Sequence, residues 1–370
     1  MDKFDYLVVG AGLFGSTFAY EAAQRGYRVK VIDKRAHIGG NIYTERIGGI
    51  DVHRYGAHIF HTQNDVIWQY MNQFTEFNHF INAPIANYRG NLYNLPFNMN
   101  TFYQLWGITS PAEAQAKIAE QRAELAGKKP QNLEEQAIAL VGTDIYQRLI
   151  KSYTKKQWGK EPKDLPAFII KRLPVRFTFD NNYFSDRYQG IPVAGYTAIV
   201  EKMLSSDRIV VETNQDFFDN KATYLREYPK IIYSGMIDNY FDYQLGVLEY
   251  RSLEFETTYL KNVANYQGNA VVNFTDEETP YTRIIEHKHF NFGQQPDTII
   301  TKEYSKEWRQ GDEAYYPVND QKNTHLYKKY VKLAKGEPNV IFGGRLGTYQ
   351  YLNMDQVVAN ALALVKREFN

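Results

Sequence analysis

The sequence contains no cysteine among its 370 residues, and this absence excludes several classes of protein. Without a thiol there can be no disulfide framework, zinc–thiolate site, iron–sulfur cluster or catalytic cysteine. The chain also lacks an excess of charge of either sign, since 43 basic residues stand against 42 acidic ones. This balance argues against a general binder of nucleic acid or of anionic membranes.

Long hydrophobic runs are missing as well. No stretch reaches the roughly 18 apolar residues that a membrane span needs, and the start, MDKFDYLVVG, has too few apolar residues for a secretion signal. We therefore expect a soluble, cytoplasmic protein. Its 44% hydrophobic residues suffice for a sizeable core, and its length suggests two or three domains. Thirty tyrosines are unusually many, and we expect most of them to pack in the core.

The clearest motif lies at the N-terminus, in DYLVVGAGLFGSTFAYEAAQRGYRVKVID. Residues 6–9 and 29–32 read as buried strands, and residues 16–24 read as the helix between them. Gly10, Gly12 and Gly15 form G-x-G-x-x-G: the first permits the turn, the second lets the backbone approach a pyrophosphate, and the third lets helix and strand pack closely. Asp33 follows the second strand and can accept ribose hydroxyls. The alternative is a plain glycine-rich turn, but the full context predicts a dinucleotide site.

Two further features favour FAD. A second glycine pair, Gly39-Gly40, precedes Asn41, as in FAD-binding chains of the glutathione-reductase type, although a surface turn would look the same. Near the C-terminus, a strand at 339–342, a turn at Gly343-Gly344-Arg345 and an amphipathic helix at 354–368 repeat the strand–turn–helix pattern, and residues 229–235 read as another buried strand. Because only one fingerprint is present, we expect a flavoprotein that is reduced occasionally or by its substrate.

The middle of the chain reads first as helical. Ser110 begins a helix with a capping box that runs to Gly127, Asn132 opens one that runs to about Val141, and Thr143 caps a third. In this third helix a shared face is expected for Tyr146, Leu149, Ile150 and Tyr153.

The stretch 159–176 carries three prolines and several basic residues, Arg176 among them, and reads as a loop with at most a turn or two of helix. Such a loop is either a lid or a solvated connection.

From 243 to 316 the residues are β-branched and aromatic, which predicts an antiparallel sheet. Two histidine pairs occur, His58 with His61 and His287 with His289. On a strand the second pair would share a face, so a metal pair is conceivable. No third ligand is apparent nearby, and we expect no metal site.

Taken together, the motifs resemble the bacterial UDP-galactopyranose mutase family. The matching stretches follow one another in the family's order along the whole chain: GAGLFGS at 10–16, HIGGNIYTE at 37–45, HRYGAHIFHT at 53–62, YTKKQWG at 153–159, IIKRLPVRF at 169–177, PYTRIIEHKHF at 280–290, YYPVND at 315–320 and GGRLGTYQYLNMD at 343–355.

The patterns and the resemblance imply an α/β fold with a discontinuous Rossmann-like FAD-binding domain, an inserted helical bundle domain and an antiparallel β-sheet domain. The FAD-binding domain is expected at 1–75, 193–241 and 317–370. The helical domain is expected at 97–175, with a mobile loop near 159–176. The sheet domain is expected at 76–96, 176–192 and 242–316.

The resemblance also implies an isomerase. The family interconverts UDP-galactopyranose and UDP-galactofuranose through a flavin N5–sugar adduct on reduced FAD, and so supplies galactofuranose for cell-surface glycans. It implies a homodimer that binds neither nucleic acid nor membrane. A flavin amine oxidase-like oxidoreductase is the main alternative, but an amine site needs no paired diphosphate arginines. A non-enzymatic flavin-binding scaffold is a third.

The family's functional residues match positions of this chain. Arg172, Arg283 and His58 match the catalytic ones. The implied substrate-binding residues are Asn82, Tyr153, Thr154, Trp158, Arg172, Tyr183, Asn273, Arg283, Tyr316 and Tyr351. The implied FAD-binding residues are Gly10, Gly12, Phe14, Gly15, Asp33, Lys34, Gly40, Asn41, His58, Ile59, Arg345, Tyr351, Asn353, Met354 and Gln356.

Two positions depart from the family pattern. Asn353 stands where many members have aspartate, which makes the neighbourhood of the diphosphate less negative. Leu149 and Ile150 stand where two aromatic residues often precede the uracil-stacking tyrosine.

Overall fold

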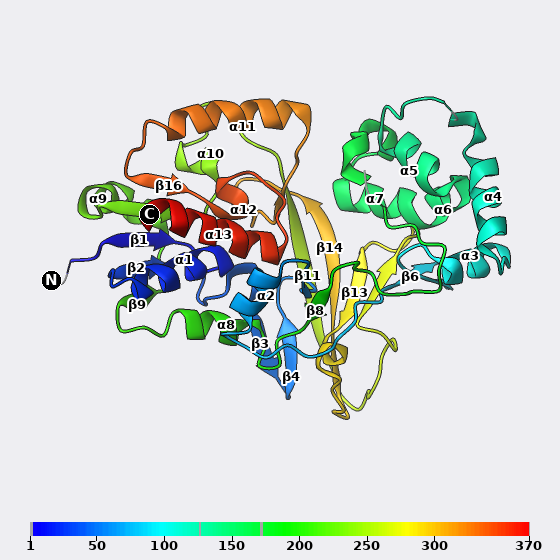
Figure 1. Cartoon of the computed structure of the whole chain (residues 1–370), viewed down its shortest axis with the longest axis horizontal. Coiled ribbons are helices and arrows are strands. Elements are labelled where there is room, and N and C mark those ends of the chain that lie inside the picture. The colour runs from blue at the N-terminus through cyan, green and yellow to red at the C-terminus, as the bar shows by residue number, and fades with distance from the viewer. Residues whose placement is uncertain (1–2, 126, 171–172, 370) are drawn as a thin grey trace.

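The computed structural model describes residues 3–125, 127–170 and 173–369. Figure 1 shows a parallel sheet with its helices at one end of the molecule, a group of helices at the other end, and a twisted mixed sheet between them. Both termini lie at the end with the parallel sheet. The two ends of the chain therefore come together in one layer.

Within the described ranges, five strands form a parallel sheet in the order β16-β10-β1-β2-β9. Their bounds are Tyr6–Val9 (β1), Val29–Ile32 (β2), Ile209–Glu212 (β9), Lys230–Tyr233 (β10) and Val340–Phe342 (β16). These runs are short and apolar because helices cover both faces of the sheet. The chain passes from β1 to β2 on one side and places β10 on the other side of β1, which makes β1 the point where the strand order reverses. Ligands bind at the carboxyl ends of strands at such a point.

Two hydrophobic clusters hold this layer together. Leu7 and Val8 are adjacent on β1 and both fully buried, but they point to opposite faces and belong to different clusters. The Val8 cluster includes side chains of α1 (Leu13–Gln24), α8 (Tyr196–Met203) and α13 (Met354–Phe369). The Leu7 cluster includes side chains of α9 (Lys221–Glu227), α10 (Ile237–Tyr240) and α11 (Gln321–Ala334).

The strands predicted at 6–9 and 29–32 are confirmed, as is the C-terminal helix. Helix α1 begins at Leu13, so the predicted start at Ser16 was three residues late. Gly12 is the N-cap with φ of −80°, and the second and third glycines of the motif thus lie at and inside the helix start. The short strands β10 and β16 fall inside the predicted stretches.

Among the described residues, the mixed sheet has seven strands in the order β15-β11-β14-β13-β12-β6-β7. Their bounds are Ile85–Tyr88 (β6), Asn91–Asn94 (β7), Tyr250–Leu260 (β11), Val271–Phe274 (β12), Arg283–Glu286 (β13), Thr298–Glu307 (β14) and Tyr316–Pro317 (β15). The prediction of an antiparallel sheet was wrong at one place, because β6 pairs with β12 in parallel. No tight turn joins these two strands, so no local signal sets their relative direction.

The helical end contains α3 (Met99–Trp106), α4 (Pro111–Gln121), α5 (Leu133–Val141), α6 (Thr143–Ile145) and α7 (Lys151–Trp158). The capping box at Ser110 and the Asn132 cap are confirmed. Helix α4 ends at Gln121 rather than Gly127, and a separate 3₁₀ turn, Ala123–Leu125, follows it. Thr143 was wrongly predicted as a helix cap, because the N-cap of α6 is Gly142 and the Thr143 hydroxyl donates instead to the Gln121 carbonyl (3.3 Å). Its hydroxyl ties α6 to the end of α4.

A π-helical turn, Tyr146–Ile150, separates α6 from α7. Tyr146, Leu149 and Ile150 are buried in the helical core, whereas Tyr153 is not part of that cluster. The prediction that Tyr153 shares their face was wrong, because a π turn inserts one residue and rotates the turn that follows.

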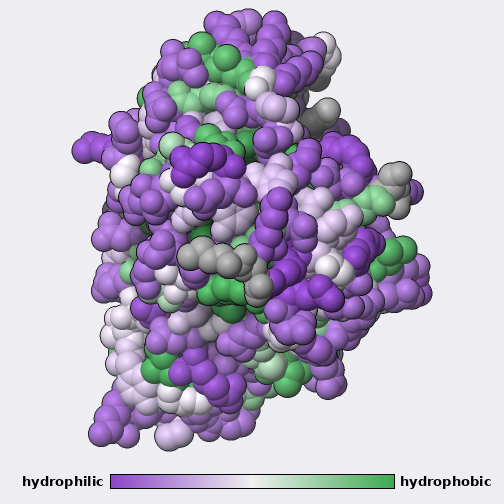
Figure 2. All heavy atoms as spheres, turned by 90° about the vertical axis from the view of Figure 1, so that its left-hand side faces the viewer, coloured by the Kyte–Doolittle hydropathy of each residue, from purple (hydrophilic) through white to green (hydrophobic). Residues whose placement is uncertain are grey.

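The remaining elements connect the layers: β3 (Thr44–Ile47) with β4 (Ile50–His53), β5 (Phe60–Thr62) with β8 (Tyr188–Gly190), α2 (Asp65–Met71) and α12 (Gly344–Gly347). The described parts of 159–176 form a loop with two 3₁₀ turns, Pro162–Asp164 and Ala167–Ile170, as predicted. The molecular face at the parallel-sheet end is mostly hydrophilic, with hydrophobic residues in small groups (Figure 2). None of the described helices is both long and apolar enough to cross a membrane.

Candidate active site

A pocket opens at the carboxyl ends of β1, β2 and β10, where the strand order reverses. Many of the residues predicted to bind FAD line it: Gly10, Gly12, Phe14, Asp33, Lys34, Gly40, Asn41, His58, Arg345 and Met354. They come from the N-terminal motif, the second glycine pair and the C-terminal segment. The fold thus brings together in one cavity three motifs that are far apart in the sequence.

Each glycine of the first turn meets a different constraint. Gly10 has φ of +106°, which favours glycine. A Cβ on Gly15 would lie 2.0 Å from the Gly10 carbonyl oxygen, so Gly15 is needed for packing. A Cβ on Gly12 would meet only the Gly40 Cα, at 3.8 Å. Gly12 therefore leaves open space above the N-terminus of α1, where backbone N–H groups can face an anion.

Asp33 is 8% exposed and binds the glycine turn directly. Its Oδ2 accepts a hydrogen bond from the Ala11 N–H (2.8 Å), and its Oδ1 accepts one from the Arg35 N–H (2.9 Å). Each carboxylate oxygen has a second lone pair for a ribose hydroxyl. Asp33 thus fixes the turn and can also contact the cofactor.

An ion-pair cluster beside Asp33 was missed by the sequence analysis. Arg35 Nη2 donates to Asn41 Oδ1 (3.0 Å) and to Glu313 Oε2 (2.9 Å), while Lys34 Nζ lies 2.7 Å from Glu313 Oε1. Burial alone would raise the pKa of Glu313, but the Arg35 and Lys34 charges outweigh it and lower that pKa. Basic residues directly after a parallel strand were the available signal for Arg35. Glu313 comes from a distant loop and had none.

His58 lines the pocket as a neutral imidazole. Its Nδ1 donates to the Gly56 carbonyl (2.8 Å), which leaves the Nε2 lone pair free to accept a hydrogen bond. Burial, together with the charges of Arg345 and Arg283, lowers the pKa of His58 to about 4. His58 is therefore uncharged at neutral pH.

The expectation that His287 and His289 lie on a strand was wrong. Both lie in a 3₁₀ helix, His287–Asn291, that follows β13. His287 Nδ1 accepts a hydrogen bond from the His53 N–H (3.2 Å), and His53 Nδ1 accepts one from the His58 N–H (3.2 Å). Over the described ranges, no group of three or more potential metal ligands occurs. His53 and His287 instead fix the backbone that carries His58, while His289 Nε2 lies 3.0 Å from Glu286 Oε2.

Acid should destabilise the protein through His58. Its folded pKa of about 4 lies below the ordinary 6.5, so the unfolded chain binds more protons between these values and stability falls as pH falls through that window. We expect His58→Gln to remove about 2 to 3 kcal/mol of the stability lost between pH 7.5 and pH 4.5. Urea unfolding of the apoprotein at both pH values measures this. His325→Gln, an exposed position on α11, should lose stability like wild type. Equal acid losses for all three proteins would contradict the assignment.

A second group of residues surrounds Arg283, beyond His58. Arg283 on β13 pairs with the buried Glu303 on β14, with Nε and Nη2 each within 2.9 Å of Glu303 Oε1. Burial alone would lower the pKa of Arg283, but Glu303 raises it, so the guanidinium stays charged. With one edge bound to Glu303, the guanidinium can present its other edge to an anion.

Three of the predicted tyrosines, Tyr153, Tyr183 and Tyr351, lie near this arginine, and Tyr316 packs against Tyr351. Burial raises the pKa of Tyr153 to about 12 and also raises that of Tyr183, with the nearby Arg283 charge opposing both shifts. The Tyr316 ring lies 5.7 Å from that of Tyr351 and 5.8 Å from that of Trp158. Tyr183 and Tyr351 are 38% and 59% exposed, so this group of side chains is open to solvent. We call Arg283, Tyr153, Tyr183, Tyr316 and Tyr351 the Arg283 cluster.

Further predicted substrate residues lie at the Arg283 cluster. Asn273 stands directly opposite Arg283 in the sheet, and its Oδ1 is buried without a hydrogen-bond partner among the described residues. Asn82 accepts a hydrogen bond from the Tyr183 N–H on its carbonyl oxygen (2.7 Å), and Thr154 is buried beside Tyr153. The unpartnered Asn273 Oδ1 suits a ligand that donates a hydrogen bond.

Lys156 fixes the helix that carries Tyr153. Its Nζ donates to three carbonyl oxygens between β12 and β13, those of Phe274 (2.7 Å), Thr279 (3.0 Å) and Tyr281 (3.2 Å). Helix α7 is thereby attached to the hairpin that carries Arg283.

Arg345 lines the Rossmann-like pocket and also lies next to Tyr351 of the Arg283 cluster. Its guanidinium donates to the carbonyls of Tyr315 (3.2 Å) and Leu352 (2.6 Å) and lies 5.4 Å from the Tyr351 ring centre. Burial lowers the pKa of Arg345. Two guanidinium groups and several phenols thus lie beside the pocket, an arrangement that can bind a diphosphate close to a group held in that pocket.

Some predicted residues lie elsewhere. Arg172 falls outside the described residues. Ile59 packs in a separate hydrophobic cluster, and the Asn353 N–H donates to Gln356 Oε1 (2.9 Å) at the start of α13. Gly15, Ile59, Tyr351, Asn353 and Gln356 do not line the pocket itself.

Comparisons with known proteins give the family and the fold. Residues 148–351 match the family model for UDP-galactopyranose mutase, and residues 8–74 match the NAD(P)-binding Rossmann-like domain. The chain is 42% identical to a probable UDP-galactopyranose mutase from Klebsiella pneumoniae, over 98% of this chain and 94% of that protein. It is 41% identical to a dTDP-fucopyranose mutase from Escherichia coli, over 96% of each. A crystal structure of a reduced UDP-galactopyranose mutase has the same fold, with a TM-score of 0.75 at 15% identity over 100% of this chain and 94% of that one.

Proposed function

The chain belongs to the UDP-galactopyranose mutase family and is an isomerase, and on this premise we propose that it interconverts UDP-galactopyranose and UDP-galactofuranose. The observation that carries the proposal is the Arg283 cluster, in which a guanidinium held by Glu303 lies among four tyrosines. Arg345, which lines the Rossmann-like pocket, lies 5.4 Å from the ring centre of Tyr351 in this cluster. A sugar nucleotide needs such fixed charge and donors for its diphosphate. The alternative of a flavin amine oxidase-like oxidoreductase is not favoured, since that chemistry uses no diphosphate site.

The family and the Rossmann-like pocket imply a flavin, and we assign it as FAD. The space above Gly12 admits a pyrophosphate at the start of α1, and Asp33 has lone pairs free for ribose hydroxyls. Phe14, His58, Arg345 and Met354 would line the flavin end. In its reduced form, bound FAD would supply the nucleophile that displaces the nucleotide and lets the sugar ring open and reclose.

The chain's own residues would then act on the nucleotide. Arg283 would hold the diphosphate and stabilise the charge that builds on it as it leaves, with Tyr183, Tyr316 and Tyr351 as neutral donors. His58 would accept a hydrogen bond at Nε2, because its proton is held at Nδ1 by Gly56. Tyr153 would offer its face to uracil. Arg172 remains a proposed diphosphate contact by resemblance, within the proposed mobile loop near 159–176.

The remaining proposals are organisational. We divide the chain into an FAD-binding domain at 1–75, 193–241 and 317–370, a helical domain at 97–175, and a sheet domain at 76–96, 176–192 and 242–316. We also propose a cytoplasmic homodimer that supplies galactofuranose for cell-surface glycans and binds neither nucleic acid nor membrane.

A second candidate substrate pair has specific support. The identity to the dTDP-fucopyranose mutase is 41%, against 42% to the probable UDP-galactopyranose mutase. These sugar nucleotides differ at the base and the sugar but share the diphosphate, which the Arg283 cluster would hold in the same way. The residues of this cluster therefore fit both sugar nucleotides.

An assay with paired substrates tests the proposal. The dithionite-reduced protein is mixed with UDP-galactofuranose or with dTDP-fucofuranose, and the products are separated by chromatography. We expect conversion of UDP-galactofuranose to the pyranose with a kcat/KM at least about tenfold above that for the dTDP sugar, one base-pocket contact being enough for that preference. A preference for the dTDP sugar would reassign the substrate, and no conversion of either would sink the proposal.

A further inference from the structure

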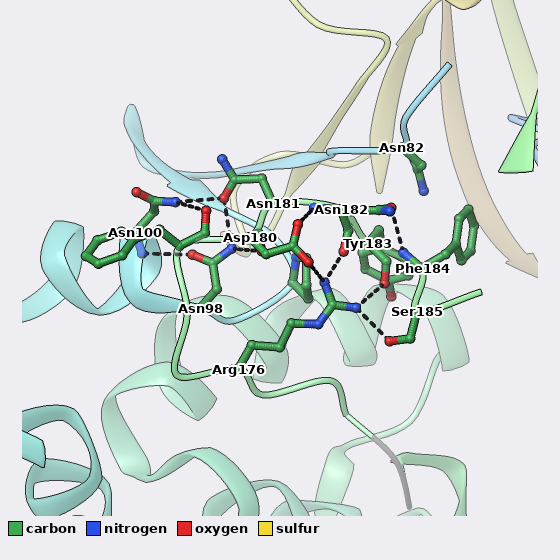
Figure 3. Close-up of polar contacts among 12 residues, drawn as sticks. Asn82, Asn98, Asn100, Arg176, Asp180, Asn181, Asn182, Tyr183, Phe184 and Ser185 are labelled. Atoms are coloured by element: carbon green, nitrogen blue, oxygen red, sulfur yellow. Dashed lines mark hydrogen bonds and ion pairs between the residues drawn. The ribbon is translucent and has the colours of Figure 1, made fainter. Parts of the chain in front are cut away.

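Tyr183 lies in a segment, residues 180–185, that forms neither helix nor strand. Its shape is set by side chains that converge on it from several directions, as Figure 3 shows. Asn98 Nδ2 donates to the Asp180 carbonyl (2.9 Å), and Asn98 and Asn100 both donate to Asn181 Oδ1 (2.8 and 2.9 Å). The N-terminus of α3 thereby holds the beginning of the segment.

Arg176 holds the rest of it. Its Nη1 donates to Asp180 Oδ2 (3.2 Å) and to the Asn182 carbonyl, and its Nη2 donates to Ser185 Oγ (2.8 Å) and, more weakly, to the Tyr183 carbonyl (3.4 Å). The Arg176 side chain is only 16% exposed. In Figure 3 the guanidinium lies against the segment, with Tyr183 and Ser185 reached from the same edge.

The backbone of Tyr183 is consequently held on both sides. Its carbonyl accepts from Arg176, and its N–H donates to the Asn82 carbonyl (2.7 Å). Beyond the segment, His61 Nδ1 lies 2.5 Å from Asp186 Oδ2, which fixes the far end to β5. Within the part of the chain that the structure describes, the Tyr183 phenol has no hydrogen-bond partner, and the side chain is 38% exposed near Arg283.

We propose that Arg176 is a positioning residue that holds Tyr183 at the diphosphate of the bound sugar nucleotide. The inference rests on the proposed function, because it assumes that the Arg283 cluster binds a nucleoside diphosphate. Arg176 makes no contact with the substrate itself. It fixes the peptide from which the Tyr183 phenol projects, and so reduces the freedom that the phenol loses on binding.

Arginine suits this place better than lysine. Four acceptors lie around one planar group, and a guanidinium reaches them with donors set at fixed angles, whereas an ammonium offers three donors from a single atom. The loss on substitution by lysine should therefore be partial, and the loss on substitution by glutamine larger.

The test is a double-mutant cycle with UDP and dTDP as probes. Each is titrated calorimetrically into the FAD-loaded wild type, Arg176→Gln, Tyr183→Phe and the double variant. We expect each single variant to bind the preferred nucleotide about tenfold more weakly, at about 1.4 kcal/mol for the lost hydrogen bonding. If Arg176 acts through Tyr183, the double variant is no weaker than the weaker single variant.

Arg187→Gln is the matched control. Arg187 follows the same segment, but its ion pair with Asp65 is exposed, at 65% and 56% of the two side chains. It should bind both nucleotides like wild type, with the same flavin content. If Arg176→Gln loses its flavin, Arg176→Lys takes its place in the cycle, with an expected loss of about threefold.

The outcomes separate the two proposals. Failure of wild type to bind either nucleotide overturns the proposed function and the inference together. Tight binding by wild type with equal binding by Arg176→Gln overturns the inference alone. Losses that multiply to about a hundredfold in the double variant also overturn it, because Arg176 would then act independently of Tyr183.

Discussion

Arg283→Ala is expected to lower kcat/KM for the sugar nucleotide by two to three orders of magnitude. Arg283 is the charged group of the Arg283 cluster, and losing a desolvated contact to a diphosphate costs about 3 to 4 kcal/mol at the transition state. Steady-state kinetics with the reduced enzyme measures the change. Arg89→Gln removes an ion pair with Glu278 that is about 60% exposed, and it should leave kcat/KM unchanged.

Arg283→Ala also leaves the buried carboxylate of Glu303 without its partner, so a loss of stability could imitate a catalytic loss. The pair Arg283→Gln with Glu303→Gln removes both charges and can keep a hydrogen bond between the strands. We expect this double variant to recover most of the thermal stability and none of the activity. Recovery of both together would show that Arg283 serves the fold rather than the substrate.

Gly12→Ala and Gly15→Ala are expected to fail in different ways. The Gly15 Cβ would lie 2.0 Å from the Gly10 carbonyl oxygen, so α1 must shift, at a cost of about 3 kcal/mol in unfolding free energy. The Gly12 Cβ meets nothing closer than 3.8 Å within the protein. It projects into the space assigned to the pyrophosphate, so Gly12→Ala should keep its stability and bind FAD about 10- to 100-fold more weakly.

Urea unfolding of the two apoproteins and fluorescence titration with FAD measure both quantities. The contrast between the variants is the informative result, because each serves as the control of the other. Normal FAD affinity in a stable Gly12→Ala protein would place the pyrophosphate elsewhere and remove the basis for the assigned cofactor site.

The parts of the structure that the sequence predicted well are those that depend on neighbouring residues. The strand–glycine–helix unit at 6–33 and the caps at Ser110 and Asn132 are set by local turn geometry and local hydrogen bonds. The tyrosine excess also has the expected explanation in large part. Many tyrosines are buried in the clusters on the two faces of the parallel sheet and in the helical core, among them Tyr6, Tyr146, Tyr196, Tyr240, Tyr330 and Tyr349.

The errors and omissions depend on contacts between distant residues. The π turn at Tyr146–Ile150 rotates Tyr153 away from the core and toward Arg283, although the sequence has helical spacing throughout. The parallel pairing of β6 with β12 joins segments far apart in the chain. The partner of Arg35, Glu313, is 278 residues away and had no local signal. The contacts of Arg176 with residues 180–185 are short in sequence, but they depend on the irregular shape of that segment.

The central claim is that this protein is an isomerase that uses a reduced flavin without consuming its electrons. It is tested most directly by counting turnovers per reducing equivalent, with sugar nucleotides separated by chromatography and flavin absorbance recorded anaerobically. After one stoichiometric addition of dithionite, we expect many turnovers of UDP-galactofuranose to UDP-galactopyranose, a flavin that stays reduced, and no conversion by the oxidised protein. Reoxidation of one flavin for each sugar converted, or equal conversion by the oxidised protein, would contradict the account.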